Sequence, residues 1–248
     1  MEEMRLMAAL LCVAAGFAQT KPARKLTARE LFHGAPETTK EAPGPAATPK
    51  RPAAILASAP AIPLGLRYSI LKETQPGATA EVDAAGVFRS GERIRLTVQT
   101  NADAYLYIVL RGSSQSWSVL FPSAEVAGGD NFLRRGARQE VPAGHWFTFD
   151  DRPGTERLFL VLSRQPVTDL EKLIYAVREA PSAGRPAKTL LAAGRPIDDA
   201  LIGRIREKVY TRDLIFEKVD EKEKAVYAVE GAGGADSRVV VEIALEHR

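Results

Sequence analysis

Three histidines and two adjacent aspartates are the side chains of this sequence with the clearest capacity for chemistry. His33, His145 and His247 lie far apart, and none stands at a metal-ligand spacing from another. Asp150 and Asp151 are neighbours, so in a strand their carboxylates would point to opposite faces, which is unfavourable for a paired-carboxylate site. His145 with Asp150 or Asp151 is the combination that could serve a secreted hydrolase, and we keep it as the alternative function.

No motif for nucleophilic, nucleotide or metal chemistry is present. The sequence has no G-x-S-x-G elbow, phosphate loop or dinucleotide fingerprint. Its single cysteine, Cys12, lies in a segment that we expect to be removed. The formal net charge is +3, with Lys and Arg interspersed among Asp and Glu, unlike the clustered basic face of a nucleic-acid-binding protein. We therefore expect no catalytic residue, cofactor, metal or nucleic-acid partner.

Aromatic side chains are the remaining candidates for contact with a ligand. Tyr105 and Tyr107 share one face of an expected strand, and Trp117 and Phe121 share one face of the next. Trp146 lies on a later strand. Core packing is one explanation, because large aromatic residues dominate β-sandwich interiors. The other is a partly exposed strip on which a glycan ring or a peptide stacks, formed by Tyr105, Tyr107, Trp117 and Trp146.

The N-terminal residues have the pattern of an export signal followed by a spacer. Residues 6–15 are an apolar segment after Arg5, and small residues precede a cleavage site between Ala18 and Gln19. We expect a signal peptide at 1–18 and an exported protein, periplasmic or extracellular, with no transmembrane span after cleavage. Proline recurs seven times in residues 35–63, which is typical of an extended, disordered linker.

A short helix is predicted at about residues 26–34, before this linker. Thr27 and Glu30 form a capping box, and Gly34 can end the helix. Two turns are marginal alone in water, so Leu31 and Phe32 must pack on another surface to be ordered. We interpret the segment as a docking element for a partner in the cell envelope, not for its own body. The alternative is a tail that is only helix-prone.

The rest of the chain predicts a mainly β body that positions these residues. We expect an antiparallel β-sandwich-like domain at 64–180, and a helix with three strands at 181–248 that extends the same body. Residues 167–179 and 197–209 have the apolar spacing of two accessory helices, which makes the whole α+β. Expected strands are residues 66–72, 93–100, 104–110, 117–121, 138–141, 146–149, 157–163, 213–219, 224–229 and 238–245. Residues 104–110 and 117–121 predict a central hairpin with both faces at least partly buried, whereas 93–100 and 238–245 alternate and so predict one apolar face each.

Four short motifs resemble a known family. They are VFRSGERIRL at 87–96, AYLY at 104–107, LFP at 120–122 and GTE at 154–156, and together they resemble the bacterial domain-of-unknown-function family 4384. The resemblance covers roughly residues 64–166, under half of the chain. It implies a β-rich domain, often in exported or multidomain proteins, with no established activity or catalytic residues. The family typically has Asp-Gly before its Tyr-Leu-Tyr, and this chain departs from it with Asp103 and Ala104.

The sequence therefore predicts an exported, non-catalytic binding or assembly protein of the bacterial cell envelope. Its expected partner is a protein or a glycan of the envelope.

Overall fold

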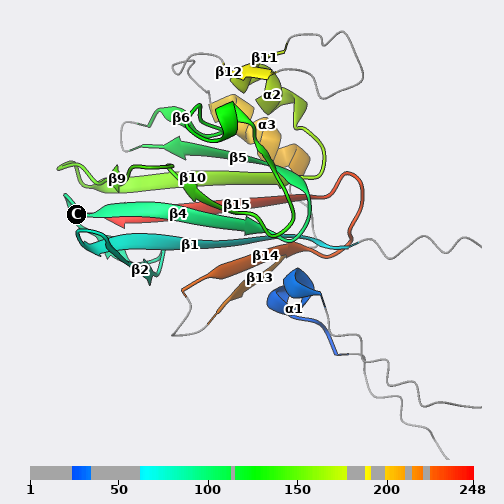
Figure 1. The fold of residues 1–248 in the computed structure, drawn as a ribbon, viewed down its shortest axis with the longest axis horizontal. Helices are drawn as coiled ribbons and strands as arrows, with labels where there is room; N and C mark the ends of the chain where they lie inside the picture. Colours follow the sequence, from blue (N-terminus) through cyan, green and yellow to red (C-terminus); the bar gives the residue numbers. More distant parts are fainter. Residues whose placement is uncertain are drawn as a thin grey trace, which may run out of the picture.

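Two β-sheets packed face to face form the centre of the molecule (Figure 1). The computed structural model describes residues 24–34, 62–112, 115–177, 188–190, 199–209, 214–219 and 224–248. The predicted signal peptide, the cleavage site between Ala18 and Gln19, and the Pro-rich linker up to residue 61 lie outside the described residues.

Sheet 1 contains the first long strand of the body and the hairpin that follows the last helix. Its order is β13 (Leu214–Lys218), β14 (Val226–Glu230), β1 (Leu64–Gln75), β4 (Arg93–Thr100) and β8 (Arg138–Val141). Two further strands pair with it, β2 (Ala78–Val82) with β1 and β9 (Phe147–Thr148) with β4. Every pairing in this sheet is antiparallel.

Sheet 2 contains the central hairpin that the sequence predicted. Its order is β3 (Val87–Phe88), β15 (Arg238–His247), β10 (Gly154–Ser163), β5 (Ala104–Arg111) and β6 (Trp117–Phe121), with β7 (Phe132–Leu133) paired to β5. The pairings are antiparallel except that of β3 with β15, which is parallel. The predicted mainly β, sandwich-like fold is confirmed.

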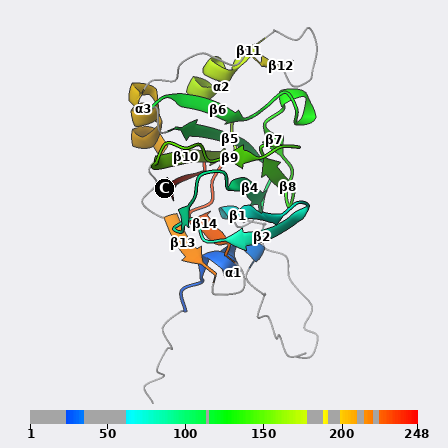
Figure 2. The ribbon, with the colours of Figure 1, turned by 90° about the vertical axis from the view of Figure 1, so that its left-hand side faces the viewer.

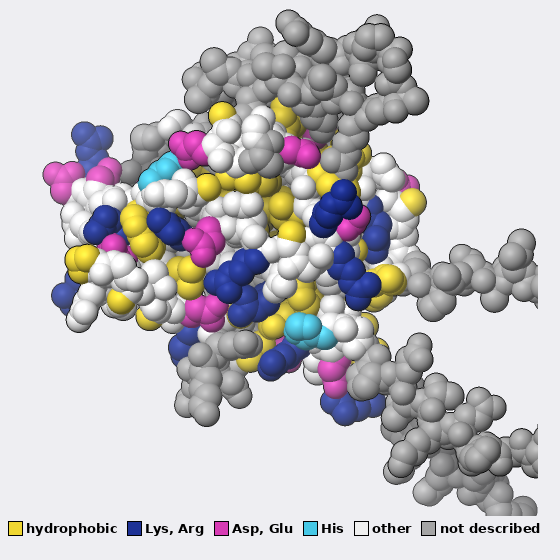
Figure 3. All heavy atoms as spheres, in the orientation of Figure 1, with side chains coloured by type: hydrophobic (Ala, Val, Ile, Leu, Met, Phe, Trp, Pro, Cys, Tyr) yellow, Lys and Arg dark blue, Asp and Glu magenta, His cyan; other side chains and the backbone are white. Residues whose placement is uncertain are grey.

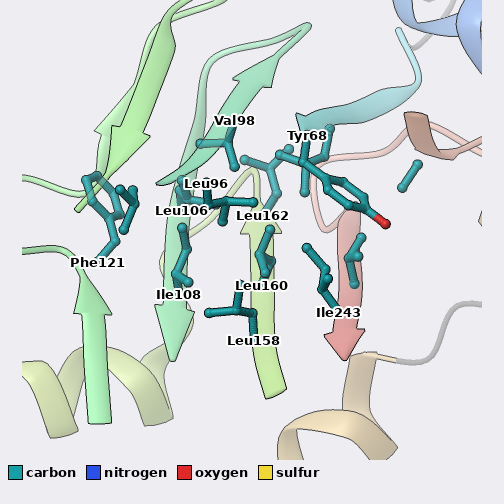
Figure 4. Close-up of a cluster of buried hydrophobic side chains, with 14 of the residues drawn as sticks. Tyr68, Leu96, Val98, Leu106, Ile108, Phe121, Leu158, Leu160, Leu162 and Ile243 are labelled. Carbon is teal, nitrogen blue, oxygen red and sulfur yellow. The ribbon is translucent and has the colours of Figure 1, made fainter. Parts of the chain in front are cut away.

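Alternation along the strands produces the main core between the sheets. On β10, Leu158, Leu160 and Leu162 point towards sheet 1, and Figure 4 shows them facing side chains of β4 such as Leu96. Side chains of β1, β5, β6 and β15 complete this layer. The apolar face predicted for residues 93–100 is therefore the face that packs against sheet 2.

Helices cover the outer side of each sheet, so the described chain has helix, sheet, sheet and helix layers (Figure 2). Helices α2 (Thr168–Ile174) and α3 (Asp199–Val209) lie on sheet 2, and α1 (Ala28–His33) lies on sheet 1. A short 3-10 helix, η1 (Ala127–Gly129), precedes β7, and β11 (Tyr175–Val177) pairs with β12 (Lys188–Leu190) beside α2. None of the described helices is long and apolar enough to cross a membrane.

The strands after residue 180 join both sheets of the body, because β14 pairs with β1 and β15 pairs along the whole of β10. One sequence expectation differs from the structure. The helix predicted at 167–179 ends at Ile174, because Tyr175 is extended (φ −119°, ψ 144°). The buried Tyr175 hydroxyl donates to the Gly129 carbonyl at 2.7 Å, a tertiary contact that outweighs local helix propensity.

Candidate functional site

Three of the four aromatic residues expected to contact a ligand belong to a core beneath α2 and α3. The side chains of Tyr107 and Trp117 are buried, with 1% and 6% exposed, and Tyr105 is half-buried beside them. Val167, Leu170 and Ile202 and their neighbours cover this outer face of sheet 2. Core packing is therefore correct for these three residues. They do not form an exposed strip with Trp146, because α2 and α3 cover them.

Trp117 and Phe121 do not share a face, as the sequence had suggested. Between β5 and β6 the register moves from Ile108 opposite Phe121 to Val109 opposite Val119, so one strand carries an extra residue. Such a bulge reverses the side to which later side chains point. Phe121 therefore enters the main core, whereas Trp117 stays under the helices.

A buried polar network fastens α2 to sheet 2. The Tyr107 hydroxyl donates to the Glu171 carboxylate, and Asn131 Nδ2 donates to the same oxygen at 3.2 Å. The Val167 amide donates to the Tyr107 oxygen at 3.1 Å. Burial and then the bond to Glu171 raise the pKa of Tyr107 well above its ordinary value. The network joins parts of the protein to one another, so we assign it a structural role.

The start of α3 is held by Trp117 and Arg111. The Trp117 indole nitrogen donates to Asp199 Oδ1 at 2.7 Å, and Arg111 donates to Asp199 Oδ2 at 3.3 Å. The Arg111 guanidinium also lies 5.7 Å from the centre of the Trp117 ring. These contacts explain why Trp117 is not available to a ligand.

Trp146 is the one predicted aromatic contact that stays near the surface without a helix above it. It is half-buried, and the Arg95 guanidinium carbon lies 4.0 Å from its ring centre. Arg95 also donates to the His145 carbonyl at 2.8 Å and to Glu140 at 3.2 Å. One face of the indole is therefore occupied by a cation held in place by two further bonds.

The short helix before the linker is present, with the predicted capping box. Glu30 N–H donates to Thr27 Oγ1 at 3.2 Å, and Thr27 N–H donates to Glu30 Oε2 at 2.9 Å. The expectation that Phe32 docks on an envelope partner and not on its own body is wrong. Phe32 is 7% exposed and packs on sheet 1, while Leu31 is half-buried at the margin.

The residues of the alternative hydrolase do not form a common site. His145 is exposed, and its Nδ1 lies 3.4 Å from Glu125 Oε2. Asp150 instead faces His247, with 3.5 Å between Oδ1 and Nε2. Within the described chain, no hydrogen bond or ion pair joins His145 to Asp150 or Asp151. No group of three or more possible metal ligands occurs in the same residues.

A pocket of about 140 Å³ opens between the sheets, at the end of the sandwich where the C-terminus lies (Figure 1). We call it the end pocket. Both sheets contribute to it: Ile94, Phe147 and Thr148 from sheet 1, Leu110, Glu156, Leu158 and Leu245 from sheet 2, and Phe149 and Asp150 from the segment after β9. Six of these nine side chains are apolar, and two are carboxylates.

His247 stands next to the end pocket, a position that sequence reasoning did not predict. Its side chain is buried, and its ring centre lies 5.1 Å from that of Phe149. Neither ring nitrogen has a hydrogen bond within the described chain. The sequence did contain a signal for this position, because His247 follows the alternating apolar residues of β15 and so points to the same inner side. Glu156 likewise shares the inward parity of Leu158 on β10.

Charged side chains are mixed on the face of the molecule that Figure 3 shows. Lys and Arg lie among Asp and Glu there, without an extended area of one sign. This surface has no resemblance to the basic tract of a nucleic-acid interface.

Comparison with known proteins agrees with the motifs. Residues 87–166, from β3 to the end of the turn after β10, match the model of a family described as a domain of unknown function (DUF4384). No curated protein and no solved structure matches the chain. The matched residues include most of the end pocket but not Leu245 or His247. The chain thus resembles the DUF4384 family over residues 87–166, as its motifs indicated.

Proposed function

We propose that this chain is an exported, non-catalytic binding protein of the bacterial cell envelope, and that the end pocket is its ligand site. The apolar pocket with two carboxylates is the observation that carries the proposal. Apolar concavities with a few converging polar groups are the usual form of small-ligand sites. The residues of the alternative hydrolase lie in separate contacts, so the geometry supports binding over hydrolysis.

The size and lining of the end pocket suggest the chemistry of its ligand. A cavity of about 150 Å³ lined by aliphatic and aromatic side chains holds one benzene molecule, and the end pocket is of similar size. Asp150 and Glu156 favour a positively charged head on such a ligand. A sugar ring fits poorly, because six apolar residues cannot satisfy its hydroxyl groups. The ligand class is therefore a small organic amine, or an amine-bearing side chain of an envelope protein.

Three probes of one shape and different charge test this proposal. Benzylamine, benzyl alcohol and benzoate are titrated into the protein, and binding is followed by NMR of the methyl groups of Ile94, Leu158 and Leu245. We expect benzylamine to bind most tightly and benzoate most weakly. Equal shifts for all three, or shifts outside the end pocket, would refute the proposed ligand chemistry.

Matched variants assign the charge preference to the pocket. Asp150→Asn and Glu156→Gln should each weaken benzylamine binding roughly fivefold, since an exposed ion pair contributes about 1 kcal/mol. Asp151→Asn is the control, because Asp151 is adjacent in sequence but does not line the pocket. An equal loss in the control would show that general surface charge, not the pocket, attracts the amine.

Export is tested separately. The native protein, isolated from its own cells, should begin at Gln19 when its N-terminus is determined by mass spectrometry. An intact Met1 in a cytoplasmic fraction would contradict the proposed location.

A further inference from the structure

Helix α1 is attached to the body by an interface distinct from the main core. Ala28 and Phe32 pack with a separate apolar group on the outer side of sheet 1, formed by Val219, Ala225, Tyr227 and Val229. The rings of Phe32 and Tyr227 meet edge to face, with 5.2 Å between their centres. We call the surface formed by Gly65 and these four residues the α1 groove.

The α1 groove is shaped for this helix. A Cβ atom at Gly65 would lie 2.8 Å from Phe32 Cδ2, closer than real atoms approach, so only glycine leaves room for the ring. The Arg29 amide donates to Glu217 Oε2 at 2.8 Å, which satisfies one of the free N–H groups at the start of the helix. His33 and Tyr227 add a polar contact of 3.4 Å between Nε2 and the hydroxyl oxygen. The α1 groove is thus specific for α1 through steric fit, a backbone hydrogen bond and ring packing.

The covalent connection does not require that α1 and its groove belong to one chain. Residues 35–61 join Gly34 to Ile62, although Phe32 already touches Gly65. A chain of that length can span at most about 90 Å, at about 3.3 Å per residue. It is therefore far longer than the contact needs, and α1 has the reach to enter the groove of another molecule.

We propose that two copies of this chain exchange α1, so that each helix occupies the α1 groove of the other copy. Both arrangements make the same contacts, so their free energies differ mainly in chain entropy. The advantage of the intramolecular form is the effective concentration of α1 near its own groove. That concentration is on the order of millimolar for short flexible linkers and falls as the linker lengthens. The exchanged dimer should therefore form at high micromolar to millimolar concentration.

The proposal is tested by mixing copies of the full mature chain that carry donor and acceptor dyes. Energy transfer should develop as the copies exchange α1, and the dimer fraction in sedimentation should rise with concentration. Phe32→Ala should weaken dimerisation at least tenfold, because without its buried ring α1 no longer stays in either groove and the undocked monomer prevails. Leu31→Ala is the matched control and should weaken it less than threefold, since Leu31 lies at the margin.

A second variant changes the groove instead of the helix. Gly65→Val should block the groove while α1 itself stays intact. Neither variant alone can form an exchanged dimer. A mixture should form a dimer with one transferred helix, because the intact helix of the Gly65→Val copy enters the vacant groove of the Phe32→Ala copy. A fluorescent peptide of residues 24–34 should also bind the Phe32→Ala chain, and the same peptide with Phe32→Ala should not.

Two results would overturn the exchange. The first is a wild-type chain that stays monomeric up to about 1 mM, the concentration scale set by the linker. The second is dimerisation that persists unchanged in Phe32→Ala, which would place the interface elsewhere. Circular dichroism and thermal melting of each variant establish that the body remains folded in either case.

Discussion

Tyr107→Phe removes one oxygen atom from the buried network that fastens α2 to sheet 2. That oxygen donates to the Glu171 carboxylate and accepts from the Val167 amide. A hydrogen bond to a charged group contributes about 1.5–3 kcal/mol, and a buried amide without an acceptor costs about 1–3 kcal/mol. Asn131 still donates to Glu171 in the variant, which limits the loss. We expect the free energy of unfolding to fall by about 3 kcal/mol.

Urea unfolding followed by tryptophan fluorescence measures this loss, because Trp117 lies in the same cluster as Tyr107. The melting temperature should fall by about 6–12 °C for a domain of this size. Tyr68→Phe is the matched control. Tyr68 is also buried (Figure 4), but its hydroxyl has no hydrogen bond within the described part of the chain, so the variant should lose less than about 0.5 kcal/mol. Equal losses in the two variants would refute the energetic role of the network.

Three further outcomes follow from the fold. Burial and then the charge of Asp83 raise the pKa of Tyr68 to about 12, so between pH 10 and 12 the unfolded chain loses this proton before the folded chain does. The free energy of unfolding should therefore fall as the pH rises through this range, and it should fall less in Tyr68→Phe. Urea midpoints measured across the range test this. The hydrogen bond from Lys218 lowers the pKa of Asp83, so this pair stabilises the fold above about pH 4 and loses its effect as pH falls further. Because Asp83 and Lys218 are both partly exposed, Lys218→Met should cost less than about 1 kcal/mol in urea unfolding at pH 7, and the cost should shrink as the pH falls below about 4. Deleting residues 237–248 should abolish cooperative melting, because β15 contributes four apolar side chains to the main core; a sharp calorimetric transition in the deletion variant would contradict this.

Local patterns predicted the three helices and the longer strands, but they missed β2, β3, β7, β11 and β12, and they did not identify the partners of the side chains. Alternation along residues 93–100 and 238–245 identified the inward faces of β4 and β15, because that pattern depends only on strand geometry. The burial of both faces of β5 was also predictable, because its apolar run leaves no polar face. The bulge between β5 and β6 was not predictable, and it moved Phe121 to the opposite side from Trp117.

The remaining wrong predictions, for Phe32 and Asp150, concern contacts between distant parts of the sequence. The docking of Phe32 depends on Tyr227 and on the missing side chain of Gly65, which no local pattern connects with the helix. At the margin of the end pocket, Asp150 meets His247, which comes from a different segment of the chain. Sequence reasoning named Asp150 but paired it with the histidine that is nearer in the chain. Strand order, which local propensity does not encode, determines which histidine it meets.

The pairing of β10 with β15 has a consequence for the order in which the protein can fold during synthesis. Ser163 of β10 lies opposite Arg238 of β15, so all of residues 164–237 must be made before this pairing begins. At about 5–20 residues per second, ribosomes take several seconds over that stretch. Throughout this interval β10 can pair with β5 on one side while its other edge stays open. Unpaired edges invite pairing with other chains, so the nascent protein is an expected client for a chaperone that shields the open edge of β10.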